Sequence, residues 1–117
     1  MWVGGGWGVE ALAGAGFRGT LDQRPVRFVA ADPAGRELDL HPLEFASHGS
    51  ATQASFDPAA PFRYPAACFV TGRIGGAAVP CLSAEQQAYF HQGYRPTARD
   101  LHDMALLREE FGIATHF

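Results

Sequence analysis

Residues 79–107 read "VPCLSAEQQAYFHQGYRPTARDLHDMALL", and this stretch carries the clearest secondary-structure signals in the chain. It contains two helical runs, each preceded by a hydroxyl residue that can cap a helix and followed by a glycine that ends it. Each run also has a polar residue three positions after its cap, as in a capping box. The sequence therefore predicts helices near residues 84–92 and 98–111. Their start and stop residues are Ser83, Gln86 and Gly93 for the first helix, and Thr97, Asp100 and Gly112 for the second.

The second of these helices has one broad apolar face. Leu101, Met104, Ala105 and Arg108 share a stripe, with Leu107 and Phe111 beside it, so the face is mostly apolar. Such a stripe at helical spacing is typical of core packing. We interpret it as core rather than as a cofactor site.

Two hairpins are expected on the N-terminal side of the helices. In residues 68–82 the side-chain character alternates on either side of Gly75 and Gly76, which favours a β-hairpin. Residues 26–45 contain "VRFVA" and "ELDLHPLEF" on either side of "ADPAGR", a turn with Pro and Gly. The intervening stretch, residues 46–62, has small residues, prolines and no apolar period, so it predicts a surface loop. Together these elements predict an α+β fold.

Length and charge limit the classes of protein. A chain of 117 residues that is 47% hydrophobic and 18% charged should form a single domain over residues 1–117 with a modest core. Its net charge is −3, and its nine basic residues, all Arg, are spread along the chain. We therefore expect neither nucleic acid nor membrane as a partner.

Cysteine content and the lack of targeting signals bear on the compartment. Cys68 and Cys81 are the two cysteines, and their count alone leaves them bridged or free. The sequence has no basic-apolar leader and no apolar run long enough to span a bilayer. We expect a cytoplasmic protein with buried thiols.

Three stretches resemble the aminoglycoside and lincosamide nucleotidyltransferases, the group that includes aminoglycoside 2''-adenylyltransferase-like proteins. They are "WVGGGWGVEALAG", "GRELDLHPLEF" and, most specifically, residues 79–107 quoted above. The resemblance covers most of the chain. It implies a small polymerase-β-like nucleotidyltransferase fold, with a mixed or antiparallel sheet, flanking helices and two C-terminal helices.

The resemblance also implies an activity. Such proteins transfer a nucleoside monophosphate from ATP or another nucleoside triphosphate to a hydroxyl group of an antibiotic, and thereby confer resistance, with Mg²⁺ as cofactor. The chemistry requires that the triphosphate be held, that metal offset its charge and that a base take the hydroxyl proton. The expected partners are therefore a nucleoside triphosphate and a small hydroxyl-bearing acceptor.

The glycine run Gly4, Gly5 and Gly6 is the candidate nucleotide-binding segment. Glycine lets the backbone approach a bulky anion, and the free N–H groups at the start of the following helix attract phosphate. A simple tight turn is the alternative interpretation.

The acidic residues depart from the family pattern. The family places an Asp-x-Asp metal-binding pair on the strand after the glycine turn, but no such pair follows Glu10 here, and Asp22 stands alone. The sequence reads as though a segment were excised between about Gly14 and Gly16. We therefore expect a shortened member that lacks one strand and exposes a sheet edge, which favours homo-oligomers.

Asp39 is the acid that the resemblance retains. In "ELDLHPL", alternation places Glu37, Asp39 and His41 on one face and leucines on the other. By resemblance, Asp39 would bind metal or take the proton from the acceptor hydroxyl. The alternative is that all three polar residues form only the wet face of a hairpin.

Two functional classes follow. One is a small-molecule nucleotidyltransferase in which Asp39 acts with a substitute acid, Asp22 or Glu10. The other is an inactive remnant or interaction module without a metal site. His91, His102 and Asp103 are secondary candidates for an acceptor cleft, and the histidine and cysteine spacings do not favour zinc.

Overall fold

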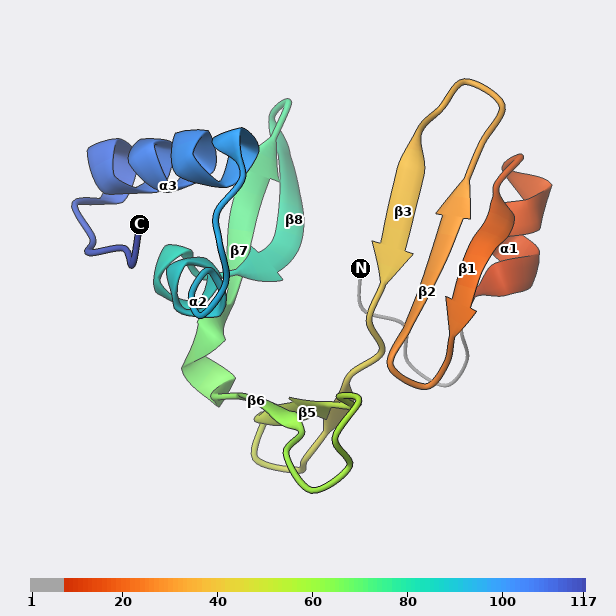
Figure 1. Ribbon diagram of the computed structural model, residues 1–117, viewed down its shortest axis with the longest axis horizontal. Helices are drawn as coiled ribbons and strands as arrows, with labels where there is room; N and C mark the ends of the chain where they lie inside the picture. The colour runs from red at the N-terminus through yellow and green to blue at the C-terminus, as the bar shows by residue number, and fades with distance from the viewer. Residues whose placement is uncertain (1–7) are drawn as a thin grey trace. The chain divides into compact units, whose positions relative to one another are not determined.

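The computed structural model describes residues 8–117, and the glycine run at residues 4–6 lies outside this range. The chain divides into two compact units, one up to Pro65 and one from Ala66 onward (Figure 1). Each unit is described by itself, and a single domain over residues 1–117 stays a prediction. No described helix has the length and apolar character needed to cross a membrane.

The first unit contains one short helix and two small antiparallel sheets. One sheet has the strand order β1-β2-β3 and the other β4-β5-β6. All strand pairs in both sheets are antiparallel. The elements are α1 (Val9–Gly14), β1 (Arg18–Gln23), β2 (Arg27–Ala31), β3 (Glu37–Leu40), β4 (Glu44–Phe45), β5 (Ala51–Gln53) and β6 (Phe62–Tyr64).

The core of the first unit lies on the α1 face of the first sheet. Phe28, Ala30 and Leu40 form a buried cluster, and Val9 and Leu12 of α1 pack against it. Along β3 the burial alternates as expected, because the leucines are covered while Glu37 and Asp39 are exposed. The alternation predicted from the sequence is therefore confirmed, and it places Asp39 on the face away from α1.

The predicted hairpin at residues 26–45 is confirmed in its first part only. Strands β2 and β3 pair with Phe28 opposite Leu40, but β3 ends at Leu40, and residues 44–45 belong to the second sheet. Pro42 cannot donate a backbone hydrogen bond to a ladder, so the strand is interrupted after His41. β1 was not predicted from the sequence and extends this sheet at its edge.

The prediction of a loop at residues 46–62 is wrong in part. β5 lies inside this stretch, and β6 begins at its end. Each of these strands has three residues, which is too short to show an alternating period in the sequence. The rest of the stretch is turn and irregular backbone, as expected.

The second unit follows the predicted secondary structure closely, but the prediction that the apolar stripe of the second helix is core is wrong in part: only Met104 is buried, while Leu101 and Phe111 are 49% and 64% exposed. The strands pair around Gly75 and Gly76, both with positive φ, as the predicted hairpin at residues 68–82 requires. Both predicted helices are present. The elements are a 3₁₀ turn (Ala66–Cys68), β7 (Phe69–Ile74), β8 (Ala77–Leu82), α2 (Ala84–Phe90) and α3 (Ala98–Phe111).

The caps of α2 and α3 explain where the helices begin. The Ser83 side chain accepts a hydrogen bond from the Gln86 backbone, while Thr97 and Asp100 form a complete capping box. At α2 the Gln86 side chain does not return a bond to the cap residue. The Ser83 backbone N–H donates instead to the Cys68 carbonyl, at 2.8 Å. α3 ends at Gly112, whose φ of 65° is left-handed.

Both cysteines are free. Cys68 is buried, and this burial raises the pKa of its thiol. Cys81 is partly buried on β8.

Candidate functional site

Asp39 lies on the face of β3 that points away from α1, opposite the buried Val29 of the central strand. Its side chain is 40% exposed, so it is reachable from solvent. The neighbouring Leu38 and Leu40 point to the covered face and hold the strand in this register. The strand therefore presents the Asp39 carboxylate outward, as the sequence predicted.

Two nitrogen-bearing side chains already contact the Asp39 carboxylate. An Arg27 guanidinium nitrogen lies 3.2 Å from Oδ2, and His41 Nε2 lies 3.2 Å from Oδ1. Arg27 comes from the start of β2, and His41 follows the end of β3. Each oxygen of the carboxylate therefore has a donor beside it.

His41 continues this contact into the second sheet. Its Nδ1 lies 3.0 Å from Gln53 Nε2, and the Tyr64 hydroxyl donates to Gln53 Oε1. Gln53 and Tyr64 are both buried, at 7% exposure each. Since Gln53 Oε1 accepts from Tyr64, its amide N–H₂ faces His41, and His41 must accept there through Nδ1. This arrangement favours the His41 tautomer with its proton on Nε2, the nitrogen that lies 3.2 Å from Asp39 Oδ1.

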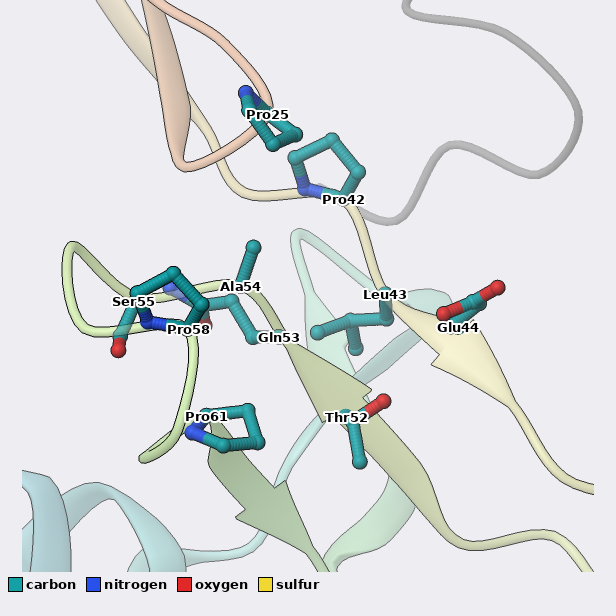
Figure 2. A pocket seen from close by; sticks show the side chains of 10 residues that line it. All are labelled: Pro25, Pro42, Leu43, Glu44, Thr52, Gln53, Ala54, Ser55, Pro58 and Pro61. Atoms are coloured by element: carbon teal, nitrogen blue, oxygen red, sulfur yellow. The ribbon is translucent and has the colours of Figure 1, made fainter.

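An open pocket of about 540 Å³ lies beside this polar chain (Figure 2). Gln53 forms part of its wall, and Pro42 directly follows His41 in the sequence. Most of the remaining wall is apolar. The lining residues are Pro25, Pro42, Leu43, Glu44, Thr52, Gln53, Ala54, Ser55, Pro58 and Pro61.

The two acids considered as partners for Asp39 lie elsewhere. Asp22 pairs in register with Phe28, whose side chain belongs to the covered face, so Asp22 and Asp39 project from opposite faces of the sheet. Asp22 also accepts two side-chain hydrogen bonds from Arg24, at 2.8 and 2.7 Å, and these lower its pKa. Glu10 is exposed on α1, the helix that packs on that same covered face.

The family implies a divalent metal, but the described residues do not fit one. Among residues 8–117, no group of three or more His, Cys, Asp or Glu side chains could hold a metal ion. Mg²⁺ prefers oxygen ligands, whereas the two Asp39 oxygens face nitrogen donors, one of them a permanent cation. The sequence before residue 8 contains no acidic residue to add.

The secondary candidates His91, His102 and Asp103 lie in the second unit. His91 Nδ1 donates to the Gln87 carbonyl at 2.6 Å, and its Nε2 lies 4.0 Å from Asp100. The pKa of Asp100 is lowered, first by the Thr97 backbone N–H that it accepts. His102 and Asp103 are exposed on α3. The contacts of His91 and Asp100 lie at the end of α2 and at the start of α3.

Sequence reasoning missed Arg27, Gln53 and Tyr64. Gln53 and Tyr64 are two polar side chains in stretches without a recognisable period, and they meet only because β5 pairs with β6. Arg27 is the second residue of the predicted strand "VRFVA", and the antiparallel pairing of that strand with "ELDL" was the signal that could have placed it near Asp39.

The described elements form an α+β fold with an acid exposed on β3. The family model described as aminoglycoside-2''-adenylyltransferase matches residues 10–107. The chain belongs to this family. The match confirms the resemblance inferred from the sequence.

Two similar proteins agree with this assignment. A lincosamide resistance protein from Staphylococcus haemolyticus is 25% identical over 134 residues, covering 92% of this chain and 83% of the relative. The crystal structure of the lincosamide antibiotic adenylyltransferase LnuA, with lincomycin bound, matches with a TM-score of 0.74 and 28% identity. The match confirms the α+β nucleotidyltransferase-like fold.

The lengths of these matches differ between this chain and its relatives. The LnuA match covers 86% of this chain but 63% of the solved chain, so this chain spans less than two thirds of that protein. In the other comparison, 92% of 117 residues is about 108, against 134 aligned residues. About 26 aligned positions of the relative therefore have no counterpart here.

Proposed function

We propose that this chain is a nucleotidyltransferase-like protein that transfers nucleoside monophosphate slowly or not at all. One observation supports this most strongly: the acid that matches the family, Asp39, has Arg27 within 3.2 Å of one oxygen and His41 within 3.2 Å of the other. No other carboxylate joins it to form a three-ligand group within residues 8–117. The protein keeps the fold of its family without the charge arrangement that the reaction uses.

The expected rate follows from electrostatics. Transfer of a nucleotidyl group places negative charge on phosphate oxygens, and the reaction is fast only where preorganised groups offset that charge. Removing a single such group commonly lowers the rate on the order of a hundredfold or more. Loss of the paired acids should cost at least this much.

The substrates of an active ancestor would be those of its relatives. We infer ATP or another nucleoside triphosphate with Mg²⁺ as donor, and a hydroxyl of a lincosamide or an aminoglycoside as acceptor, in the cytoplasm. β1 stands at an edge of its sheet with five of its six residues exposed. That edge supports self-association of this chain.

A second candidate is an active enzyme built on Glu37 and Asp39. The two acids are two residues apart on β3, and both are exposed on the same face. This spacing is that of a carboxylate-x-carboxylate pair. The pair would have to release Asp39 from Arg27 and His41 before it could act.

The test compares nucleotide binding and transfer in two proteins. Isothermal titration with ATP should detect no Mg²⁺-dependent binding by the present chain. A second protein carries an inserted strand and helix with an Asp-x-Asp pair between Gly14 and Ala15, and its transfer from ATP to lincomycin or an aminoglycoside should be about a hundredfold faster or more.

An insertion with Asn-x-Asn in place of Asp-x-Asp is the matched control, since it restores the segment without the charge. Brisk Mg²⁺-dependent transfer by the present chain would contradict the proposal. Loss of that transfer in Glu37→Gln would then establish the second candidate.

A further inference from the structure

The pocket beside Gln53 has the size and lining of a small-molecule site. Its volume of about 540 Å³ lies within the range of roughly 300–1,000 Å³ that is typical of such sites. Four proline rings, Leu43 and Ala54 supply the apolar wall. Proline has no backbone N–H, so these positions offer no donors to an anion.

The polar side of the pocket carries one uncompensated charge. Glu44 and Thr52 stand directly opposite each other in the β4–β5 pair, and both line the pocket (Figure 2). Within the part of the chain that the structure describes, the Glu44 carboxylate has no ion pair and the Thr52 hydroxyl has no hydrogen bond. Both groups are therefore available to a ligand.

The other polar groups of the lining are already occupied. The Ser55 hydroxyl bonds within its own loop, to the carbonyls of Asp57 and Ala60 at 2.7 and 2.8 Å. Gln53 bonds to His41 and Tyr64, which holds this part of the wall in place. A ligand therefore meets an apolar surface, one carboxylate and one free hydroxyl.

We propose that this pocket binds a singly charged organic ammonium ion that carries an apolar ring. The ring would pack on the proline and leucine surfaces, while the ammonium group would lie at Glu44 with the Thr52 hydroxyl as a second acceptor. A single carboxylate offsets one positive charge, which favours such a ligand over a polycation. The inference goes beyond the proposed function, because binding here needs neither nucleotide nor metal.

The experiment titrates the full chain with two ligands of the same shape and different charge. They are cyclohexylmethylamine hydrochloride and its neutral counterpart cyclohexylmethanol, followed by amide chemical shifts in ¹H–¹⁵N spectra without nucleotide or Mg²⁺. Both should shift the amides of Leu43, Thr52 and Ala54 in a saturable way, and the ammonium ligand should bind more tightly.

Two variants separate the contribution of charge from that of apolar contact. Glu44→Gln should weaken the ammonium ligand by about fivefold, the upper range for an exposed ion pair, and leave the alcohol unchanged. Leu43→Ala should weaken both ligands alike. Glu10→Gln makes the same charge change on α1, away from the pocket, and should weaken neither.

Several results would overturn the proposal. They are shifts that do not saturate at the pocket residues, equal affinity for both ligands, or ammonium affinity that Glu44→Gln does not change. Dispersed spectra of each variant establish that it is folded. Because no nucleotide is present, none of these results bears on transfer, which the insertion experiment tests separately.

Discussion

The two units of this chain differ in how their polar residues are used. In the second unit, polar side chains such as Ser83, Thr97 and Asp100 satisfy helix ends next to them in the sequence. In the first unit, the polar chain from Asp39 through His41 and Gln53 to Tyr64 connects two different sheets. The second unit therefore uses polar residues for local structure. The first unit gathers them from distant segments beside a pocket.

This contrast predicts which substitutions unfold the protein and which change only its chemistry. Among residues 8–117, Leu40 and Met104 are the two most completely buried large side chains, one in each unit. We expect Leu40→Ala and Met104→Ala each to lower the free energy of unfolding by about 2–5 kcal/mol, from lost burial and the cavity left behind. Urea denaturation followed by circular dichroism measures this cost.

Leu106→Ala is the control on α3, because that side chain is 44% exposed. It should change the free energy of unfolding by well under half of the Met104→Ala effect. If Leu40→Ala lowered the free energy of unfolding no more than Leu106→Ala, packing of Leu40 in the core would not be what holds β3 in position.

The next largest loss in free energy of unfolding should come from a substitution in the polar chain of the first unit. Tyr64→Phe removes the hydroxyl that donates to Gln53, and leaves a buried amide oxygen without that donor. An unsatisfied buried acceptor costs about 1–3 kcal/mol. The same variant should release the His41 tautomer, which ¹⁵N chemical shifts of the imidazole report directly.

Gln53→Glu separates the contact of residue 53 with Tyr64 from its contact with His41. A carboxylate can still accept from the Tyr64 hydroxyl, but it cannot donate to His41 Nδ1. The imidazole shifts should then change even if the free energy of unfolding does not. An unchanged tautomer in both variants would contradict the hydrogen-bond direction described above.

The sequence predicted the second unit better than it predicted the first. Both C-terminal helices and the hairpin at β7–β8 were predicted within two residues, because caps, glycine stops and alternation are local signals. The exposure of Asp39 was also predicted, since it needs only the alternation of β3.

The environment of Asp39 could not be predicted in the same way. His41 meets Gln53 across a separation of 12 residues, through strands of two and three residues that leave no periodic trace. The sequence could identify the acid, but it could not show that Arg27 and His41 already contact both of its oxygens.

A helix cap in the second unit should have a smaller effect than the buried chain. Thr97→Ala removes the side chain that accepts from the Asp100 backbone N–H at 3.2 Å. We expect a loss of about 1 kcal/mol, the usual contribution of an N-cap residue. Thr97→Ser should retain most of this contribution, since its hydroxyl can accept the same bond.

The same cap predicts a pH dependence. The pKa of Asp100 lies below its usual value of 3.8, mainly because its carboxylate accepts from the Thr97 backbone N–H. Its stabilising effect is therefore complete above about pH 4 and is lost as the pH falls through the lower, folded-state pKa. Between pH 5 and pH 2, Asp100→Asn should lose less thermal stability than the unchanged protein, and equal losses in the two proteins would contradict this.

Asp39→Asn should have the smallest effect on stability. The carboxylate is 40% exposed and its contact with Arg27 is partly solvated, so the ion pair contributes little, and Asn keeps one oxygen that can accept from Arg27 or His41. We expect the free energy of unfolding to change by about half a kcal/mol or less. Thermal unfolding of the variant and of the unchanged protein measures this difference. A large loss of stability would mark Asp39 as a structural link between β2 and β3. The first unit would then use its polar residues for structure, as the second unit does.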